Sequence, residues 1–512
     1  MKESIPPILR PEHVAPVAFS ALVAQFGLNF AHAGEAELLG ISMNTGDLRA
    51  GDLFVAMPGQ KTHGAAFAAR AIELGAVAII TDSIGFELIS NREVPIAIME
   101  QPRKQLGALA AQVYGNLGLV MPKTYATTGT NGKTSTSYLL EAILRQLGQV
   151  TGLTSTAERH IAGEVIVSRL TTPESPEMHA LIARMREKQV ESIAIEVSAQ
   201  ALTQLRVDGL IFDVAGFTNL SHDHLDDYGD MATYFAAKAR LFSPEHARRG
   251  VICLDSSFGQ QMVQSAQIPV VTISSNSEVT ADWKVQVTEE LPSRTAFKVT
   301  SPNGETLDSH IPIIGAHMAH NAALAIAMIC ESGVPFGDVA RAVKDGIKAY
   351  LPGRTERVTG KSGPDVFVDF GHSPDAFLNT LAAVRKVTKG KVIMLFGADG
   401  DRDATKRPDM AKVSARGCDI LVITDHHPRF EDPASIRATL VSAAREERAD
   451  LEIFEVSPPE AAIRKAVSLA DEGDSILWAG PGHQDYRDIR GVRTPYSARQ
   501  EARAALAEAG WN

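Results

Sequence analysis

The chain has 512 residues, of which 45% are hydrophobic and 22% charged, and its formal net charge at pH 7 is −11. This length exceeds a single hydrophobic core, so we expect about three domains. The acidic excess argues against a nucleic-acid partner, and any anionic ligand would be held by local basic residues. Without an apolar run of ~18–20 residues or an apolar signal core, we expect a cytoplasmic protein with no membrane partner. Three scattered cysteines, Cys253, Cys330 and Cys418, suit a reducing compartment.

Residues 1–119 predict a small α/β domain. Residues 51–59 are typical of a strand that ends in a turn, residues 65–74 of a helix, and residues 75–80 of a buried strand. Polar residues in loops beside these strands could hold a ligand: Thr45, Gln60, Lys61 and Thr62. Taken alone, such residues are more often ordinary turn residues.

A glycine-rich loop lies between a predicted strand at residues 123–127 and a predicted helix at residues 136–147. It runs from Thr128 through Gly129, Thr130, Asn131, Gly132 and Lys133 to Thr134, in the strand–loop–helix context of phosphate-binding loops. Its N–H groups would surround an anion, Lys133 would reach the β- and γ-phosphates, and the Thr134 hydroxyl would bind Mg²⁺. Thr127 replaces the glycine of the strict pattern, so the alternative is a turn that caps a helix.

Residues 120–350 alternate strand and helix patterns, which predicts a mostly parallel sheet. Glu196 ends the short apolar run at residues 192–197, and ligands gather at the carboxyl ends of strands in such sheets. Without the phosphate loop, an acid that caps the next helix would be the preferred interpretation. With the loop, Glu196 is a candidate metal ligand.

Residues 222–227 crowd two histidines and three aspartates into six positions. Zinc would need further Cys or His ligands at a suitable spacing, whereas His224 with Glu196 suits Mg²⁺, which takes few protein ligands. The alternative is a solvated loop. In the predicted helix at residues 231–242, Lys238 lies off the apolar face, as a surface lysine would. A lysine beside Mg²⁺ would be repelled unless its charge were removed or reversed.

The remaining segments predict hairpins and a third domain. Residues 270–312 are β-rich, and residues 351–354 mark a hinge. Strand patterns at residues 366–370, 391–396, 419–424 and 474–478 are separated by helix patterns, which predicts a Rossmann-like domain. It lacks the G-x-G-x-x-G fingerprint, so dinucleotide binding is not expected.

Several motifs occur together in one order from about residue 51 to residue 486: 128–134, 171–173, 196–198, 223–226, 234–242, 352–354, 400–403 and 426–429. In these motifs the chain resembles the Mur ligase family of ATP-dependent amide-forming enzymes. The resemblance implies an α/β fold with a nucleotide-sugar domain at residues 1–119, a central ATP-binding domain at 120–350 and a C-terminal amino-acid-binding domain at 351–512, in a monomer. It also implies a diamino acid (meso-diaminopimelate, lysine or ornithine) added to UDP-N-acetylmuramoyl-L-alanyl-D-glutamate during peptidoglycan synthesis.

The resemblance also implies a role for each matching position. Lys133, Lys238 and His224 would be catalytic, with Lys238 carbamylated, and Thr134, Glu196, His224 and Lys238 would hold Mg²⁺. ATP would contact residues 129–134, Asn321, Arg354 and Asp369. The uridine nucleotide would contact Thr45, Gln60, Lys61 and Thr62. The muramyl dipeptide would contact Thr171, Thr172, Ser198, Gln204 and Arg206. The incoming amino acid would contact Arg402, Arg429 and Gly480.

The implied reaction activates the D-glutamate side-chain carboxylate as an acyl phosphate, which the amine then attacks. The chain departs from the family pattern at residues 44–46, 199–200 and 317–318, and the most telling departures concern the amino-acid end. Diaminopimelate-adding members usually have Asp-Asn before Pro-Arg and Glu after Gly-His, where this chain has His426, His427 and Gln484. Arg429 could still pair with a distal carboxylate, which favours diaminopimelate only slightly. Two alternatives stay open: another ligase of the superfamily, such as a folylpolyglutamate synthase, and a P-loop nucleotide-binding protein without catalysis.

Overall fold

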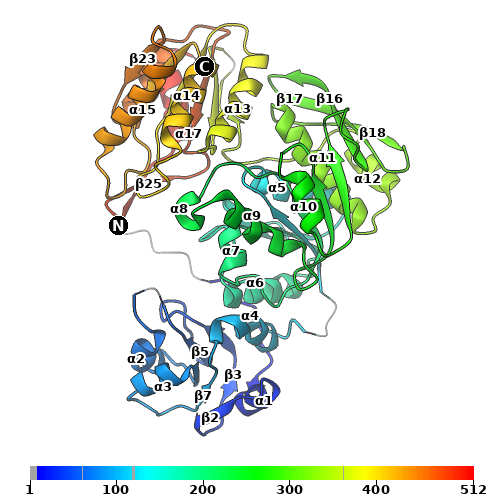
Figure 1. The fold of residues 1–512 in the computed structure, drawn as a ribbon, viewed down its shortest axis with the longest axis vertical. Coiled ribbons are helices and arrows are strands. Elements are labelled where there is room, and N and C mark those ends of the chain that lie inside the picture. Colours follow the sequence, from blue (N-terminus) through cyan, green and yellow to red (C-terminus); the bar gives the residue numbers. More distant parts are fainter. Residues whose placement is uncertain (1–7, 60, 118–120, 361, 512) are drawn as a thin grey trace.

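The computed structural model describes residues 8–59, 61–117, 121–360 and 362–511. Three α/β regions follow one another along the chain, and Figure 1 shows the first in blue, the second in cyan to green and the third in yellow to red. The three-domain α/β architecture predicted from the sequence is confirmed. Within these ranges, none of the helices combines the length and apolar composition that crossing a bilayer requires.

The first region is a small sheet in the order β2-β7-β6-β5-β4, parallel except for β2. Alternate residues of its strands face opposite sides, so Leu53 and Val55 pack in one cluster and Phe54 and Ala56 in another. The elements are β1 (Val17–Ala18), α1 (Phe19–Gln25), β2 (Asn29–His32), β3 (Glu37–Leu38), β4 (Gly40–Ser42), β5 (Asp52–Ala56), η1 (Gly64–Phe67), α2 (Ala68–Glu73), β6 (Ala78–Thr81), α3 (Ser83–Leu88), β7 (Ile96–Ile98) and α4 (Pro102–Val113).

The central region is built on a long sheet in the order β11-β10-β9-β12-β8-β13-β14-β15-β16-β17-β18. Its middle strands are parallel, and both edges are antiparallel hairpins. Of the β-rich segment predicted at residues 270–312, the first strand joins the parallel part and the other three form the hairpins of one edge. The strands are β8 (Lys123–Thr128), β9 (Thr151–Thr154), β10 (Glu158–Ile161), β11 (Glu164–Val167), β12 (Ser192–Glu196), β13 (Phe212–Phe217), β14 (Ala247–Cys253), β15 (Val270–Ser274), β16 (Trp283–Leu291), β17 (Arg294–Thr300) and β18 (Thr306–Ile311).

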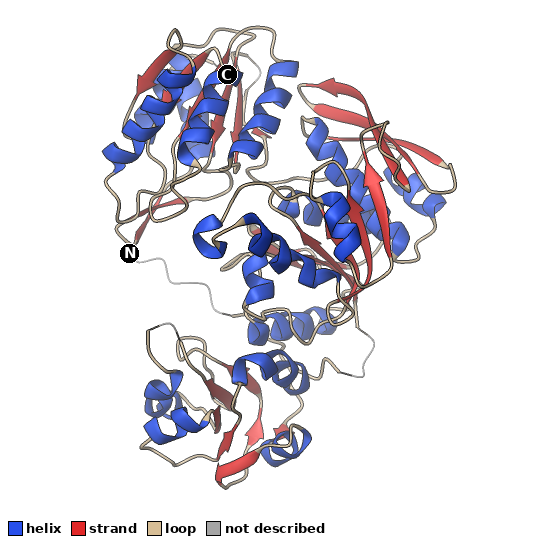
Figure 2. Cartoon of the chain, viewed as in Figure 1, coloured by secondary structure: helices blue, strands red, loops and turns tan. Residues whose placement is uncertain are grey.

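Helices cover both faces of the central sheet (Figure 2). One face packs against α5 (Lys133–Gln146), α11 (Ala316–Glu331) and α12 (Phe336–Val343). The other face packs against α6 (Ser175–Glu187), α7 (Ala199–Thr203), α9 (Met231–Ala239), η2 (Arg240–Phe242) and α10 (Gly259–Ser265), and α8 (Leu225–Tyr228) lies beside α9. Burial on both faces explains why these strands are continuous apolar runs.

The third region has the sheet order β19-β20-β24-β21-β22-β23, parallel except for β19. Its strands are β19 (Glu356–Arg357), β20 (Asp365–Asp369), β21 (Val392–Phe396), β22 (Ile420–Ile423), β23 (Glu452–Glu455) and β24 (Ser475–Ala479), followed by the hairpin of β25 (Tyr486–Ile489) and β26 (Val492–Pro495). Its helices are α13 (Pro374–Val387), α14 (Arg407–Gly417), α15 (Pro433–Glu447), α16 (Pro459–Ser468) and α17 (Ala498–Glu508). Proline opens α13 and α15 after side-chain caps by Ser373 and Asp432, so both helix starts are encoded locally.

Candidate active site

A cleft of about 2290 Å³ lies where the carboxyl ends of the central and C-terminal sheets meet. The loops after β8, β12 and β13 line it from one side, and the loops after β20, β21, β22 and β24 line it from the other. Ligands bind outside the carboxyl ends of strands in open α/β sheets, because the connecting loops converge there. Residues of the first region, including Asn44 and Asp47, close one end of the cleft.

The phosphate loop has the backbone conformation that an anion cradle needs. Gly129 has φ +151°, and a Cβ there would lie 1.9 Å from the Thr218 hydroxyl. Gly132 has φ +86°, and a Cβ there would lie 2.6 Å from Asn321 Oδ1. Helix α5 begins at the next residue, so its unpaired N–H groups and partial positive charge face the loop. Both glycines are therefore required by space as well as by conformation.

Two lysines converge on this loop. Lys133 Nζ donates to the carbonyls of Thr130 (2.9 Å) and Gly129 (3.2 Å), and Lys238 Nζ donates to the Gly129 carbonyl (2.7 Å). Lys238 is 1% exposed and lies over the Tyr234 ring, so the interpretation as a surface lysine is wrong. Burial, with the charge of Lys133, holds the pKa of Lys238 well below its usual range. A buried amine of this kind has a neutral form at moderate pH.

Glu196 joins the loop to the neighbouring strands. Its carboxylate accepts from the Thr134 hydroxyl (3.0 Å) and from the backbone N–H (2.8 Å) and hydroxyl (3.0 Å) of Thr156. Arg354 from the hinge donates to the same Thr134 hydroxyl at 2.9 Å. A buried carboxylate and a hydroxyl in contact are hard oxygen donors, which fit Mg²⁺.

His224 reaches the cleft from the loop after β13. It adopts a left-handed conformation (φ 57°), and its side chain is 46% exposed. Its ring lies 3.7 Å from Asp223 and 4.0 Å from Asp227. Burial is the largest cause that lowers the pKa of His224, and the charges of Lys133 and Lys238 lower it further. The four residues of the predicted metal site therefore share one end of the cleft, although His224 approaches it from the solvent side.

The residues predicted to contact ATP come from the central region, the hinge and the third region. Asn321 packs against Gly132, and Asp369 accepts from the backbone N–H groups of Thr355 (2.7 Å) and Gly371 (2.6 Å). The Arg354 guanidinium stacks on the Phe370 ring at 4.4 Å. These contacts place Asn321, Arg354 and Asp369 on one wall, beside the phosphate loop.

The residues predicted for the muramyl dipeptide form a connected layer beside Glu196. The Thr172 hydroxyl donates to the Glu196 carbonyl (2.9 Å) and accepts from the Ser198 N–H (3.1 Å). Thr172 is buried, and these two bonds hold the backbone at Glu196 and Ser198 in place. The Thr171 hydroxyl donates to Thr156 Oγ1 (3.0 Å), because the single Thr156 proton is donated to Glu196. Arg206 donates to Gln204 (2.7 Å) and to Glu174 (2.8 Å). Thr171, Ser198 and Arg206 face the cleft, while Thr172 and Gln204 lie behind it.

The predicted uridine residues are not gathered in the same way. Thr45 follows Asn44 of the cleft wall, but Thr45, Lys61 and Thr62 are not part of that wall. Gln60 lies outside the described residues. At this end the wall instead contains Arg169 paired with Asp47 at 2.8 Å, which joins the central and first regions and which the sequence motifs did not indicate.

The C-terminal wall contains Arg402, Arg429 and Gly480, as predicted for an amino-acid pocket. Arg429 has φ 50°, and its guanidinium donates to the Gly400 carbonyl at 2.9 Å and lies 3.8 Å from Asp399. His426 pairs with Asp399 at 2.9 Å. Asp399, His426 and His427 together form a group of possible metal ligands, whose ligand atoms lie within 4.8 Å of one another.

His427 and Gln484 form a direct pair in this pocket. The backbone N–H of Asp488 donates to His427 Nδ1 (3.0 Å), so Nε2 carries the proton and donates to Gln484 Oε1 (2.9 Å). Burial, with the charge of His426, lowers the pKa of His427 to about 4. Two of the three residues that depart from the family pattern here, His427 and Gln484, therefore satisfy each other.

Lys406 supports Asp223 of the cleft wall, and the sequence motifs did not indicate this role. Its Nζ contacts Asp223 Oδ1 at 2.8 Å, and both side chains are buried. Burial alone would raise the pKa of Asp223, but the charges of His224, His372 and Lys406 hold it well below its usual range. Lys406 lies three residues beyond the predicted motif at 400–403, which is the one local signal of its role.

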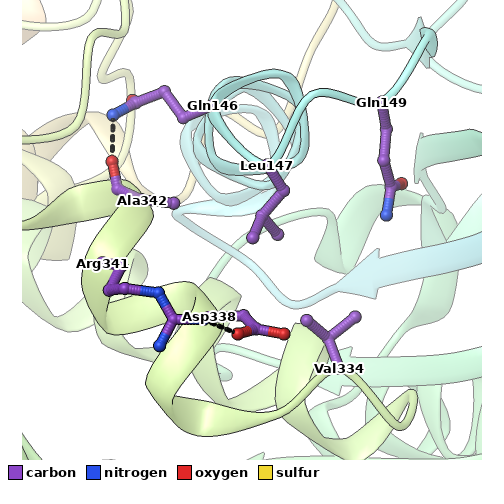
Figure 3. Close-up of a pocket in the computed structure, with 7 residues that line it drawn as sticks. All are labelled: Gln146, Leu147, Gln149, Val334, Asp338, Arg341 and Ala342. Atoms are coloured by element: carbon purple, nitrogen blue, oxygen red, sulfur yellow. Dashed lines mark hydrogen bonds and ion pairs between the residues drawn. The ribbon is translucent and has the colours of Figure 1, made fainter.

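A second hollow, of about 480 Å³, lies away from the motif residues, between the end of α5 and α12 (Figure 3). Gln146 donates there to the Ala342 carbonyl at 2.8 Å, and Asp338 pairs with Arg341 within one helix turn. The hollow contains none of the predicted site residues, so the large cleft is the candidate active site.

Three family models match the chain: "Mur ligase family, catalytic domain" over residues 37–114, "Mur ligase middle domain" over residues 127–329 and "Mur ligase, glutamate ligase domain" over residues 353–482. The chain belongs to the Mur ligase family. It is 53% identical to a UDP-N-acetylmuramyl-tripeptide synthetase of Leifsonia xyli subsp. xyli, over 99% of each chain. It is 40% identical to a UDP-N-acetylmuramoyl-L-alanyl-D-glutamate–2,6-diaminopimelate ligase of Streptomyces avermitilis, over 97% of this chain and 98% of the relative.

A solved structure of a UDP-N-acetylmuramoyl-L-alanyl-D-glutamate–2,6-diaminopimelate ligase matches with a TM-score of 0.65 and 25% identity, over 93% of this chain and 96% of that structure. The expected family and the ligase class are therefore confirmed. These matches include the N-terminal region, which disfavours the folylpolyglutamate synthase and non-catalytic alternatives.

Proposed function

We propose that this Mur ligase joins a diamino acid to the D-glutamate side-chain carboxylate of UDP-N-acetylmuramoyl-L-alanyl-D-glutamate at the expense of ATP. The observation that carries the proposal is one continuous cleft with a phosphate loop at one end and a basic, carboxylate-containing pocket at the other. The names of the relatives with 53% and 40% identity support the same substrate. We also propose a cytoplasmic monomer with domain boundaries at residues 119/120 and 350/351.

ATP would bind across the phosphate loop, with Asn321, Arg354 and Asp369 beside it. Thr134, Glu196, His224 and Lys238 would hold Mg²⁺, which would neutralise charge on the transferring phosphoryl group when bound. The fit rests on the Glu196–Thr134 contact and on the start of α5 at Lys133, whose free N–H groups face the loop. Lys133 would exchange its bonds to the loop carbonyls for contacts to the β- and γ-phosphate oxygens.

Lys238 would act as a carbamate. Its buried amine, with a strongly lowered pKa, provides the neutral nucleophile that adds to CO₂. The addition gives a carbamate anion and one proton. A negative group at this position would remove the repulsion between Lys238 and Lys133 and would supply an oxygen donor beside Glu196.

The reaction would proceed in two displacements. The D-glutamate carboxylate, positioned by Thr171, Ser198 and Arg206, attacks the γ-phosphorus, the bond to the β-phosphate breaks and ADP leaves, while Lys133 stabilises the charge that grows on the phosphoryl oxygens. The amine of the incoming residue then attacks the acyl carbon, and phosphate leaves. The uridine nucleotide would extend toward Thr45 and the loop of Gln60, Lys61 and Thr62.

Arg402, Arg429 and Gly480 would form the amino-acid pocket, and Arg429 favours meso-diaminopimelate slightly over lysine or ornithine. In the test, purified protein is incubated with ATP, Mg²⁺, the UDP-muramyl dipeptide and an equimolar mixture of meso-diaminopimelate, lysine and ornithine. The products are identified by mass. We expect one UDP-tripeptide, formed only when ATP and the dipeptide nucleotide are both present. Absence of any tripeptide while ATP is hydrolysed with another acceptor would overturn the proposal.

A further inference from the structure

Glu158 lies on the cleft wall between its two ends. It begins β10, two residues after Thr156, which contacts Glu196 at the phosphate end. Its charge also acts on His483, which precedes Gln484 at the amino-acid end. Glu158 belongs to none of the sequence motifs, and the roles proposed above do not use it.

A buried polar network fixes this carboxylate. Oε2 of Glu158 accepts from the Tyr138 hydroxyl (2.8 Å) and lies 3.3 Å from His160 Nε2. The other ring nitrogen of His160 lies 2.7 Å from Glu141, which also accepts from Thr151. Glu158 and His160 share one face of β10 because they are two residues apart. The network therefore runs from the interior beside α5 out to the cleft.

The network carries one more negative charge than positive. Burial alone would lower the pKa of His160, but the two carboxylates raise it to about 9, so one cation lies between two anions at neutral pH. The His160 contact also lowers the pKa of Glu158, which keeps it ionised. Asp47, Asp223 and Asp399 of the same wall each have a basic partner, whereas His160 is shared between Glu158 and Glu141.

One oxygen of Glu158 is left for a ligand. Among the described residues, Oε1 has no hydrogen-bond partner, and the side chain is 33% exposed. Arg354, the nearby permanent cation, is already bonded to Thr134 and stacked on Phe370. His483 is neutral, because burial and the charges of Arg354 and Arg499 lower its pKa to about 3. The wall thus presents an ionised carboxylate whose remaining partner would be a cation.

We infer that Glu158 Oε1 binds an ammonium group of the incoming amino acid and orients it between the phosphate end and the C-terminal pocket. This inference rests on the proposed function, since the amino acid is the cationic reactant of that reaction. The ATP phosphates and the UDP-linked dipeptide are anionic, so a carboxylate would repel them. The α-ammonium is the group concerned, because it must lie next to the acyl phosphate formed beside Glu196, while the side chain extends toward Arg429.

The test compares wild-type protein with E158Q and with E164Q, a matched control on the exposed partner strand β11. Removing a charge-assisted hydrogen bond predicts a rise of about 10- to 100-fold in KM for the diamino acid in E158Q. KM for ATP and for the UDP-dipeptide, and acyl phosphate formed without amino acid and trapped by borohydride, should stay within about twofold of wild type. E164Q should match wild type throughout.

Two results would overturn the inference. One is an unchanged KM for the diamino acid in E158Q while the wild type is an active ligase. The other is an equal loss for all three substrates with a lowered melting temperature, which would make Glu158 a clamp between β10 and α5. Y138F, which removes one hydrogen bond but keeps the carboxylate, should change KM for the diamino acid far less than E158Q. A wild type that joins no diamino acid would instead defeat the proposed function, and this inference with it.

Discussion

The phosphate end of the cleft is built from groups that already bond to one another, whereas the amino-acid end keeps part of its bonding capacity for a ligand. Lys133, Lys238 and Glu196 are all engaged with the phosphate loop or its neighbours. At the other end, the buried Nε2 of His426 has no hydrogen-bond partner among the described residues, and Arg402 is exposed.

This difference separates two tasks. Phosphoryl transfer needs charges held in advance where charge develops, and a rigid, interlocked set provides them. Selection of an amino acid depends on a few side chains that bond to the ligand directly, so a small number of replacements can alter it. His427 and Gln484 are candidates for such a replacement, because each satisfies the other's hydrogen bonding.

Replacement of Lys133 by alanine should have the largest effect. Without its ammonium group, charge on the transferring phosphoryl oxygens is uncompensated, and we expect kcat to fall on the order of 10²–10³-fold. Binding of the UDP-dipeptide, measured by calorimetry, should persist. Lys104→Ala, on the exposed side of α4, is the control and should retain activity. Full activity in Lys133→Ala would remove the catalytic role of the loop.

Replacement of Lys238 by arginine should be the next most damaging change. A guanidinium stays charged and cannot form a carbamate, so we expect kcat to fall by about 10²-fold. In the wild type, activity at limiting CO₂ should rise when bicarbonate is added, and the variant should not respond. Thermal melting checks that the larger side chain is accommodated beneath Gly129. A variant that retains wild-type kcat would argue against the carbamate.

Arg429→Ala tests the other end of the cleft. Loss of a bidentate partner should raise KM about 10- to 100-fold for an amino acid with a distal carboxylate, such as meso-diaminopimelate. Lysine and ornithine, which lack that carboxylate, should be affected much less. Arg429→Lys should fall between the wild type and Arg429→Ala for diaminopimelate. Equal effects on all three amino acids would show that Arg429 supports the pocket without selecting its ligand.

The comparison also explains what the sequence could predict. The phosphate loop, Glu196 at a strand end and the alternating strands of the C-terminal sheet depend on local patterns, and the structure contains all of them. The burial of Lys238 could not be derived locally, because the loop whose carbonyl accepts its hydrogen bond is 109 residues away. The Asp223–Lys406 pair joins residues 183 positions apart, and it follows from the way the two sheets face each other.

Glu158 was missed for the same reason. Nothing in the sequence around it forms a motif, and its importance depends on Tyr138 and Glu141 of α5, which approach it only in the folded chain. The residues predicted to contact the uridine nucleotide are the opposite case, because the sequence indicated them but the cleft wall contains none of those that the structure describes. Lys61 and Thr62 were plausible as loop positions, but the cleft wall lies elsewhere, so their role stays a prediction.

The smallest effect on catalysis, and a measurable one on stability, is expected from His160. Its folded pKa of about 9 exceeds its ordinary value of 6.5, so its stabilising contribution is complete below about pH 6.5 and is lost as pH rises through about 9. The shift corresponds to about 3 kcal/mol. The difference in unfolding free energy between wild type and His160→Gln should therefore shrink between pH 6.5 and 9.5 in urea titrations. A difference that stays constant over this pH range would show that the imidazolium does not link Glu141 to Glu158.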